Sequence, residues 1–274
     1  MQDGILIIDK PQDFTSFDVV AKVRKALHTK SVGHTGTLDP LATGVLVVCV
    51  GKATKLVQYL TCENKKYEAE MKFGIQTDTG DITGKVVLEK EYDLSLEKIN
   101  EVISKFIGEQ KQVPPMYSAL KVNGKKLYEY AREGIEIERE ARDIRIDYIK
   151  DVSFENDTLK FTVACSKGTY IRTLCEDIAI ALGTCGTMTN LRRVQTGEFE
   201  IKDAISVDEI SEEKVISIEK LFDKSIDVKN NMKKLLNGME IPVDLPDGLY
   251  NLYADEYVGI GKVQSKKLKR EIIL

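Results

Sequence analysis

The stretch KYEAEMKF, residues 66–73, alternates strictly between two kinds of side chain. Its apolar members are Tyr67, Ala69, Met71 and Phe73, and a lysine or a glutamate occupies every position between them. Successive side chains of a strand point to opposite faces, so the pattern predicts an antiparallel strand with one face on the core and the other in water. Such a strand needs neighbouring strands to form a sheet.

The segments around this strand combine two periodicities. Residues 159–166, LKFTVACS, alternate in the same way, whereas GILIID at 4–9 and GVLVVCV at 44–50 are continuous apolar runs typical of strands buried on both faces. Residues 95–107 and 170–182 are helix-like, and a glycine follows each. We therefore expect an α+β fold, in which a mixed, largely antiparallel sheet carries flanking helices, and not a doubly wound parallel sheet.

The composition changes after residue 197. Residues 198–227 carry ten acidic and four basic side chains, and we expect this stretch to be the linker-like end, with short helices, of a first domain over 1–227. Beyond it, prolines and glycines separate short strand-like runs such as LYNLYA and REIIL. These runs predict a small β-rich module over 228–274.

Length and composition place the chain among ordinary globular proteins. It has 274 residues, of which 42% are hydrophobic and 31% charged, so a disordered chain is excluded. No apolar run reaches membrane-spanning length, and the first strand-like segment is too short for a secretory signal, which favours a cytoplasmic protein. An odd number of cysteines without a C-x-x-C pair indicates reduced thiols, and with two histidines we expect no metal site. The cysteines are Cys49, Cys62, Cys165, Cys175 and Cys185.

The formal charge of −4 weighs against a polyanionic partner until its distribution is considered. The acidic stretch 198–227 has a net charge of −6, which leaves +2 for the remainder. Local clusters of lysine and arginine stand in that remainder, at 52–66, 121–132 and 262–270. Such clusters are more often solvated faces than binding sites, so a nucleic acid stays one alternative among others.

Residues 32–48, VGHTGTLDPLATGVLVV, place three glycines, His34 and an Asp39-Pro40 pair around the start of an apolar run. An Asp-Pro pair is most often only a turn, but glycines that permit close backbone approach, on a loop beside a strand, are typical of a functional site. The chain has no G-x-S-x-G for a hydrolase triad, and the loop has neither a Walker ending nor G-x-G-x-x-G. His34 fits a ligand contact or an ordinary loop histidine equally well.

A second set of polar residues follows the strand at 159–166. In CSKGTYIRTLCEDI, residues 165–178, Tyr170 and Arg172 lie just past the strand end, where a guanidinium fork can hold a carboxylate or a phosphate. The structural alternative puts Tyr170 in the core and Arg172 in a surface ion pair. A contact between Arg172 and Asp39 would favour a functional site.

Seven motifs occur in order over roughly residues 1–200. They are GILIIDKP, VGHTGTLDPLATGVL, KKYEAEMKFG, TDTGD, VPPMYSALKVNGKKLYEYAREGIE, CSKGTYIRTLCEDI and LRRVQTGEF. Together they closely resemble the TruB family of bacterial tRNA pseudouridine 55 synthases. The resemblance implies the mixed sheet of a pseudouridine synthase, followed by a small RNA-binding module of the PUA type at 228–274.

The resemblance implies an isomerase that acts on uridine 55 in the T arm of tRNA. The family breaks the N-glycosidic bond of a flipped-out uridine and rejoins the base through carbon 5, with no cofactor and no metal. Asp39 of GTLDP matches the aspartate that bonds covalently to the substrate, at either the base or the ribose. Tyr67 of KKYEA matches the tyrosine that stacks on the target base, and Leu191 of LRR matches an apolar wall of its pocket.

Other motif positions imply further contacts. Tyr170 and Arg172 of GTYIR match residues around the catalytic carboxylate, so the family implies an Arg172–Asp39 pair. His34 of GHTG matches a histidine that contacts the RNA, and Asp81 of TDTGD matches a polar group at the pocket edge. Four cations are candidates for contacts to the RNA backbone: Lys52, Lys125, Lys126 and Arg132.

Two other functions share part of this evidence. A guide-RNA-dependent pseudouridine synthase has the aspartate loop and GTYIR, but also a longer, more basic C-terminal region and protein partners. An RNA-binding or RNA-folding protein with secondary catalysis would reshape the T arm as well. The short tail favours a stand-alone enzyme, a monomer without an obligatory protein partner, whose acidic stretch 198–227 faces away from the tRNA.

Overall fold

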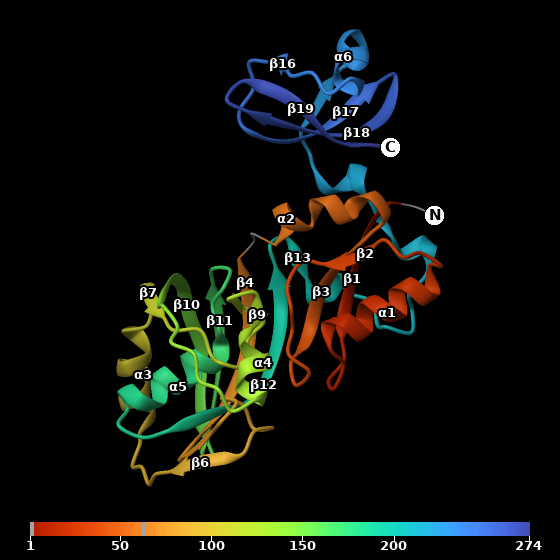
Figure 1. Cartoon of the computed structure of the whole chain (residues 1–274). Coiled ribbons are helices and arrows are strands. Elements are labelled where there is room, and N and C mark those ends of the chain that lie inside the picture. Colours follow the sequence, from red (N-terminus) through yellow and green to blue (C-terminus); the bar gives the residue numbers. More distant parts are fainter. Residues whose placement is uncertain (1–2, 62–63) are drawn as a thin grey trace.

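The computed structural model describes residues 3–61 and 64–274 (Figure 1). A ten-stranded sheet forms its centre, and eight of the strands follow one another across it. In that order they are β14 (Ile216–Ser217), β1 (Gly4–Lys10), β3 (Thr43–Val50), β12 (Gly186–Thr196), β4 (Lys65–Phe73), β11 (Thr158–Cys165), β10 (Arg142–Glu155) and β7 (Gly108–Gln112). Beside this path, β2 (Val32–His34) pairs with β3, and β13 (Phe199–Glu200) pairs with β12. Only the pairing of β3 with β12 is parallel among these strands, so the expected mixed, largely antiparallel sheet is confirmed.

Short helices and two hairpins surround the sheet. The α-helices among the described residues are α1 (Ser16–Ala26), α2 (Val57–Leu60), α3 (Leu96–Ser104), α4 (Leu127–Arg132), α5 (Ile171–Ala181) and α6 (Met232–Leu236). A 3₁₀ helix, η1 (Gly51–Leu56), leads into α2. The hairpins are β5 (Ile75–Thr77) with β6 (Val86–Glu89), and β8 (Lys121–Val122) with β9 (Lys125–Lys126).

Strands β1 and β3 are buried on both faces of the sheet. Leu6 and Ile8 belong to the large hydrophobic cluster that includes residues of α1, α3 and α5, whereas Ile5 and Ile7 belong to a second cluster on the opposite face. Both alternating sets of β1 side chains therefore meet apolar neighbours. This explains why the sequence of these strands shows no alternation, as expected.

Strand β4 lies in the middle of the sheet with one covered face. Tyr67, Ala69, Met71 and Phe73 are buried in the cluster under the helices, and the lysines and glutamates between them are exposed or half-buried. On the open face, Lys160 Nζ of β11 lies 3.1 Å from Glu70 Oε1. The expected half-solvated antiparallel strand is confirmed.

Local capping sets the ends of the helices. The Thr15 hydroxyl oxygen accepts a hydrogen bond from Asp18 N at 3.1 Å, and the Asp18 carboxylate accepts one from Thr15 N at 2.8 Å, so α1 begins at Ser16. Helix α3 ends earlier than the expected 95–107, because the amides from Lys105 onward bond to carbonyls three residues back. Helix α5 agrees with its expectation within one residue at each end.

The two halves of the large sheet meet where β3 pairs in parallel with β12. Thr43 lies opposite Arg192, and Gly44 lies opposite Arg193. Gly44 has a φ of +101°, and a Cβ atom there would clash with the backbone carbonyl of Arg193. Glycine at this position therefore lets the two backbones approach.

The acidic stretch 198–227 is held to the large sheet, which differs from its linker-like expectation. β14 pairs with the edge of β1, and Ile205 N donates to Ile7 O at 2.9 Å. Val215 and Ile218 are buried, while nearly all the acidic side chains around them are exposed. Apolar residues spaced between the acids thus anchor the stretch, and only its outer surface is strongly charged.

A second sheet of five strands forms the C-terminal module, at the top of Figure 1. In order they are β15 (Ser225–Asp227), β17 (Gly248–Ala254), β18 (Glu256–Gln264), β19 (Lys267–Ile273) and β16 (Ile241–Pro242). This sheet begins at Ser225, slightly before the expected boundary, because β15 pairs in parallel with β17. Ile260 and Ile272 of the module are buried in the cluster that contains Ile5 and Ile7. The expected α+β fold with a β-rich C-terminal module is confirmed.

Four of the five cysteines lie among the described residues, and each is a buried free thiol. They are Cys49, Cys165, Cys175 and Cys185, and Cys62 lies outside the described residues. None of the helices in the described part of the chain is long and apolar enough to cross a membrane.

We expect Gly44→Ala to lower the free energy of unfolding by about 3 kcal/mol, because the new Cβ meets the Arg193 backbone and the residue keeps a positive φ. Gly134→Ala is the matched control, since Gly134 also has a positive φ (+73°) but no atom within 4 Å of the added Cβ. That variant should lose about 1 kcal/mol. Urea denaturation measures both, and equal losses would contradict the packing argument.

Candidate active site

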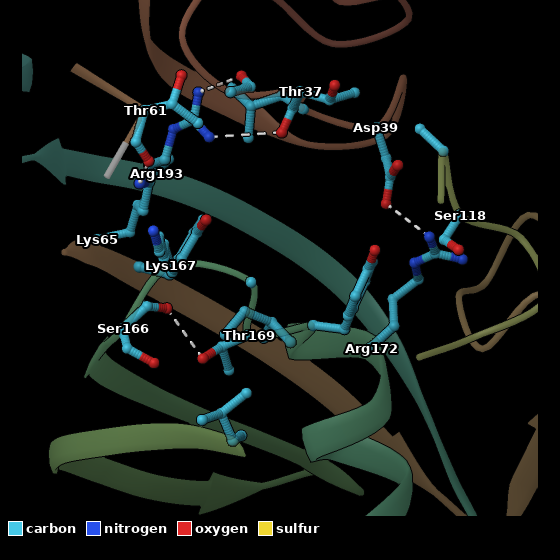
Figure 2. A pocket seen from close by; sticks show the side chains of 18 of the residues that line it. Thr37, Asp39, Thr61, Lys65, Ser118, Ser166, Lys167, Thr169, Arg172 and Arg193 are labelled. Carbon is cyan, nitrogen blue, oxygen red and sulfur yellow. Dashed lines mark hydrogen bonds and ion pairs between the residues drawn. The ribbon is translucent and has the colours of Figure 1, made fainter. Parts of the chain in front are cut away.

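A pocket of about 600 Å³ opens beside the junction of β3 and β12 (Figure 2). Its walls come from the loop at 35–39, the start of β4, the segment 118–120, and the turn that leads into α5 at 166–172. Thr61, residues 142–144 of β10, and Leu191 and Arg193 of β12 complete the lining. These segments are far apart in the sequence, and the sheet brings them to one place.

The loop that carries Asp39 is held by side-chain and backbone contacts on both sides. Ser16 Oγ accepts a hydrogen bond from Leu38 N at 2.9 Å and donates to Leu38 O at 3.1 Å. After the aspartate, Pro40 O accepts a hydrogen bond from Asp13 N at 2.8 Å. The carboxylate is therefore presented by a fixed loop.

Arg193 fixes the same loop from the side of the sheet. Its side chain is buried, and Nε donates to Val45 O at 2.7 Å. The two terminal nitrogens donate to Thr37 O at 3.4 Å and to Gly36 O at 3.1 Å, as Figure 2 shows. A buried guanidinium thus satisfies its donors with the carbonyls of the aspartate loop.

Lys10 supports the loop from the end of β1. Its side chain is fully buried, and Nζ donates to Phe14 O at 2.6 Å, to Pro11 O at 2.9 Å and to Pro40 O at 3.3 Å. Burial lowers the pKa of the Lys10 ammonium to about 8, against the opposing effect of the Asp39 charge. The chain therefore keeps a costly buried amine at the base of this loop.

Arg172 forms an ion pair with Asp39. Nη2 of Arg172 lies 3.0 Å from Asp39 Oδ2, and this guanidinium is almost fully buried while the carboxylate is 39% exposed toward the pocket. The same guanidinium donates to the carbonyls of Thr79 and Tyr117, each at 2.7 Å. The arginine is thus fixed by its neighbours, and it orients a carboxylate that remains open to a ligand.

Asp81 lies behind Arg172 and does not line the pocket. Its Oδ2 is 4.0 Å from Arg172 Nη1, and its Oδ1 accepts hydrogen bonds from Thr83 N and the Thr79 hydroxyl, each at 3.0 Å. The residue is buried. Asp81 is therefore a second charge partner of Arg172. It contacts the arginine from outside the cavity, whereas the motif implies a position at the pocket edge.

Tyr170 lines the pocket at the start of α5, and its backbone is clamped by Gln112 of β7. Tyr170 N donates to Gln112 Oε1 at 2.8 Å, and Gln112 Nε2 donates to Tyr170 O at 3.0 Å. Burial raises the pKa of the Tyr170 hydroxyl, and the nearby Ser118 side chain and the charges of Arg142 and Arg172 oppose this effect. The phenol therefore stays protonated near neutral pH.

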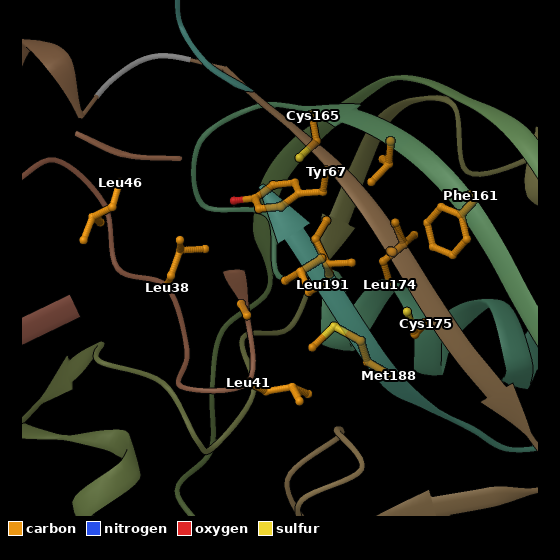
Figure 3. Close-up of a cluster of buried hydrophobic side chains, with 14 of the residues drawn as sticks. Leu38, Leu41, Leu46, Tyr67, Phe161, Cys165, Leu174, Cys175, Met188 and Leu191 are labelled. Carbon is orange, nitrogen blue, oxygen red and sulfur yellow. The ribbon is translucent and has the colours of Figure 1, made fainter. Parts of the chain in front are cut away.

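Tyr67 and Leu191 give the pocket an apolar floor. Both are buried residues of the main hydrophobic cluster, and both line the cavity. Figure 3 shows the Tyr67 hydroxyl pointing away from Phe161 and toward the side of Leu38. Burial raises the pKa of Tyr67, and the nearby Arg193 guanidinium opposes this effect. The surface beside the carboxylate is thus flat and apolar on one side.

His34 is not part of the pocket lining. It ends β2, its Nδ1 is buried without a hydrogen-bond partner among the described residues, and its pKa is lowered by burial and by Arg193. The imidazole is therefore neutral at physiological pH. The geometry brings together Asp39, Tyr67, Tyr170, Arg172 and Leu191 from the expected set, but leaves His34 and Asp81 outside the cavity.

The four cations expected to contact RNA lie outside the cavity as well. Lys125 pairs with Glu133 and lies 4.6 Å from the centre of the Tyr130 ring, while Lys126 and Arg132 lie over the Tyr128 ring. Their hairpin and helix are tied to the pocket wall by hydrogen bonds from Leu127 N to Leu120 O and from Tyr128 N to Ser118 O. Lys52 is exposed on η1, apart from this group.

The charge of the lining is positive although the chain is acidic. Two acids, Asp39 and Asp143, face five cations: Lys65, Arg142, Lys167, Arg172 and Arg193. No residue of 198–227 lines the cavity. Among the described residues there is no group of three or more histidine, cysteine, aspartate or glutamate side chains suited to a metal ion.

Sequence reasoning missed Arg193 and Lys10. Side chains two apart on a strand share a face, so the assignment of Leu191 to the pocket wall already pointed to Arg193. Lys10 likewise shares a face of β1 with the buried Ile8. For Lys10 the sequence offered no such signal, because β1 is apolar on both faces.

The Lys10 amine predicts a distinct dependence of stability on pH. Between about pH 8 and pH 10 it is neutral in the folded chain and still protonated in the unfolded chain, so the free energy of unfolding rises with pH by on the order of 2 kcal/mol for this group. Lys10→Met removes that rise. In urea denaturation from pH 7 to 10, the free energy of unfolding of the wild type should therefore rise relative to that of Lys10→Met. The exposed Lys25→Met is the control. A difference in free energy of unfolding between wild type and Lys10→Met that stays constant with pH would refute this role.

Comparison with known proteins agrees with this geometry. Residues 24–171 match the model of the TruB family pseudouridylate synthase N-terminal domain, and residues 172–244 match that of the tRNA pseudouridylate synthase B C-terminal domain. Two relatives named tRNA pseudouridine synthase B are similar over nearly their whole length. The protein from Clostridium kluyveri is 47% identical over 94% of this chain and 95% of its own, and that from Clostridium perfringens strain 13 is 45% identical over 99% of both.

The fold also resembles that of a solved structure. A chain in the crystal structure of a Cbf5-Nop10-Gar1 complex superposes with a TM-score of 0.71 and 29% identity, over 95% of this chain and 78% of that one. The sequence identity, and the share of the other chain that is covered, are both higher for the curated bacterial relatives. The chain described here belongs to the TruB family of pseudouridylate synthases.

Proposed function

We propose that this protein converts uridine 55 in the T arm of tRNA to pseudouridine, with Asp39 as the group that bonds covalently to the substrate. The observation that carries the proposal is the Asp39–Arg172 ion pair of 3.0 Å at the edge of a cavity floored by Tyr67 and Leu191. A carboxylate oriented by a buried arginine, beside a flat apolar surface, suits covalent chemistry on a planar base. The names of the curated relatives support tRNA as the substrate.

The chemistry requires a base that has left its stack. Unstacking and unpairing cost a few kcal/mol, which contacts in the pocket offset. The bond from N1 to C1′ of the ribose breaks, and a bond from C5 to C1′ forms. C5 then loses a proton and N1 gains one, so the reaction is an isomerisation without a cofactor. Asp39 forms a transient bond to the base or the ribose and is released in the same turnover.

Each other pocket residue has a part in this proposal. Tyr67 stacks on the flipped base and Leu191 closes its apolar side, while Tyr170 lies beside the carboxylate. Arg193 and Lys10 are positioning residues, since both donate hydrogen bonds to carbonyls of the Asp39 loop.

The RNA extends beyond the cavity in this proposal. Lys125, Lys126 and Arg132 lie on the hairpin and helix tied to the pocket wall, where they suit contacts to phosphates, and Lys52 suits a contact further out. We assign His34 a contact to the RNA beside the cavity and Asp81 the support of Arg172. Residues 1–227 form the catalytic domain in this proposal, with 228–274 as a PUA-like RNA-binding module.

We propose a stand-alone enzyme that acts as a cytoplasmic monomer and needs neither a guide RNA nor a protein partner. The high identity to bacterial tRNA pseudouridine synthase B proteins over nearly the full chain supports this choice over a guide-RNA-dependent synthase. The oriented Asp39 carboxylate in the lining of a pocket supports catalysis over a role in RNA folding alone.

The purified protein alone should convert one uridine in the T loop of an unmodified tRNA transcript, as mapped by pseudouridine-specific chemistry. Asp39→Asn should lower the rate by at least about a thousandfold while tRNA binding persists, because the amide keeps the shape and loses the nucleophile. Asp9→Asn, which alters an ion pair with Arg192 away from the pocket, is the control and should retain activity. Conversion only after a guide RNA or partner is added would overturn the stand-alone assignment.

Tyr67→Ala should lower kcat/KM by about tenfold or more, since a stacked base is worth roughly 1–3 kcal/mol. Tyr67→Phe keeps the ring and should lose much less. Tyr67 is also a core residue, so thermal unfolding of both variants must show that the fold persists at the assay temperature. Kinetics of Tyr67→Ala that match the wild type would remove Tyr67 from the base-binding surface.

A further inference from the structure

Phe17 is an exposed aromatic residue at the start of α1. Its exposed fraction is 63%, while the neighbouring Ser16, Val19 and Val20 are buried. The guanidinium carbon of Arg24 lies 5.6 Å from the centre of the Phe17 ring, one face of which is thereby covered by a cation. Because residues seven apart share a face of a helix, the two side chains form one exposed unit on α1, which we call the Phe17–Arg24 platform.

The platform is connected to the loop that carries Asp39. Ser16, the residue before Phe17, makes both hydrogen bonds to Leu38, and Leu38 lines the cavity next to Asp39. At the other end, Arg24 Nη2 donates to Val32 O at 3.3 Å, which ties the platform to β2 and the approach to His34. An exposed ring is therefore held in a fixed position beside the catalytic loop.

The charges around the platform favour a nucleobase with its phosphate over an acidic or purely apolar partner. The nearest acid in sequence, Asp18, is engaged by both the Thr15 amide and the Thr15 hydroxyl, so it does not pair with Arg24. Phe17 is a single ring and no wide apolar patch, which argues against a protein interface. An aromatic ring next to arginine is the usual combination for stacking an unpaired base.

We propose that the Phe17–Arg24 platform stacks a second unpaired base of the substrate RNA, outside the cavity that takes the reacting uridine. This inference rests on the proposed RNA substrate. It adds a binding position on α1 that none of the motif residues supplies. The reacting base and its neighbour would then be held on two separate aromatic surfaces, Tyr67 inside and Phe17 outside.

The absence of tryptophan from the chain allows a direct test. Phe17→Trp keeps an aromatic surface and introduces a single tryptophan, which can be excited apart from the tyrosines and whose fluorescence a stacked base should quench when a T-arm hairpin RNA is titrated. Ile180→Trp is the matched control, because Ile180 is equally exposed (63%) but lies more than two helical turns along α5 from Arg172. We expect quenching that saturates with RNA in the first variant and little change in the second.

Affinity gives the second readout. Phe17→Ala and Phe17→Leu should both raise the Kd for the hairpin about tenfold, and Phe17→Tyr should restore it, since the ring and not the apolar volume does the stacking. Ile180→Ala should bind and turn over as the wild type does. Fluorescence of the Phe17→Trp variant that RNA leaves unquenched, or a Phe17→Leu variant with wild-type Kd, would overturn the proposal. Both readouts measure binding without turnover, so a protein that binds RNA through Phe17 yet makes no pseudouridine would contradict only the proposed function.

Discussion

The guanidinium of Arg193 joins the two halves of this molecule at its active site. The residue sits on β12, where that strand pairs with β4 along one side and briefly, in parallel, with β3 along the other. Its three donors reach carbonyls of the loop before Asp39 and of β3 itself. Together with the pairing of β3 with β12 and the Asp39–Arg172 ion pair, this contact links the half that presents the carboxylate to the half that supplies Tyr67 and Arg172. Gly44 makes the approach sterically feasible, and Arg193 fixes it.

The buried cations of the site have more backbone carbonyls than carboxylates as hydrogen-bond partners. Arg193 and Lys10 bond mainly to backbone carbonyls, and of the three buried cations described above only Arg172 has carboxylate partners. A carbonyl satisfies a donor without cancelling its charge, so the positive potential persists in the cavity. This arrangement costs desolvation, which the lowered pKa of Lys10 reports. It also explains how an acidic chain presents a positive site: the acids of 198–227 lie elsewhere on the surface.

Much of the fold could be predicted from local patterns. The alternation in β4 and the unbroken apolar runs of β1 and β3 each report how many faces of a strand are covered, and the structure confirms both. The attachment of 198–227 to β1 was not predictable, because its anchoring residues Val215 and Ile218 are spaced too irregularly among acids to suggest a packed segment. The Asp39–Arg172 contact was expected only through the family motifs. Spacing alone left open whether Arg172 holds a carboxylate or phosphate in a site or forms a surface ion pair, since residues far apart in sequence meet only through the sheet.

Ile260 and Ile272 of the C-terminal module pack in one buried cluster with Ile5 and Ile7 of the large sheet, which fixes how the two parts face a large ligand. A module on a flexible tether would have to search for its docking position each time, and that lost freedom would weaken binding. Here the apolar contact settles the distance and angle between the two parts before any encounter. A ligand that touched both parts would therefore meet one preformed surface.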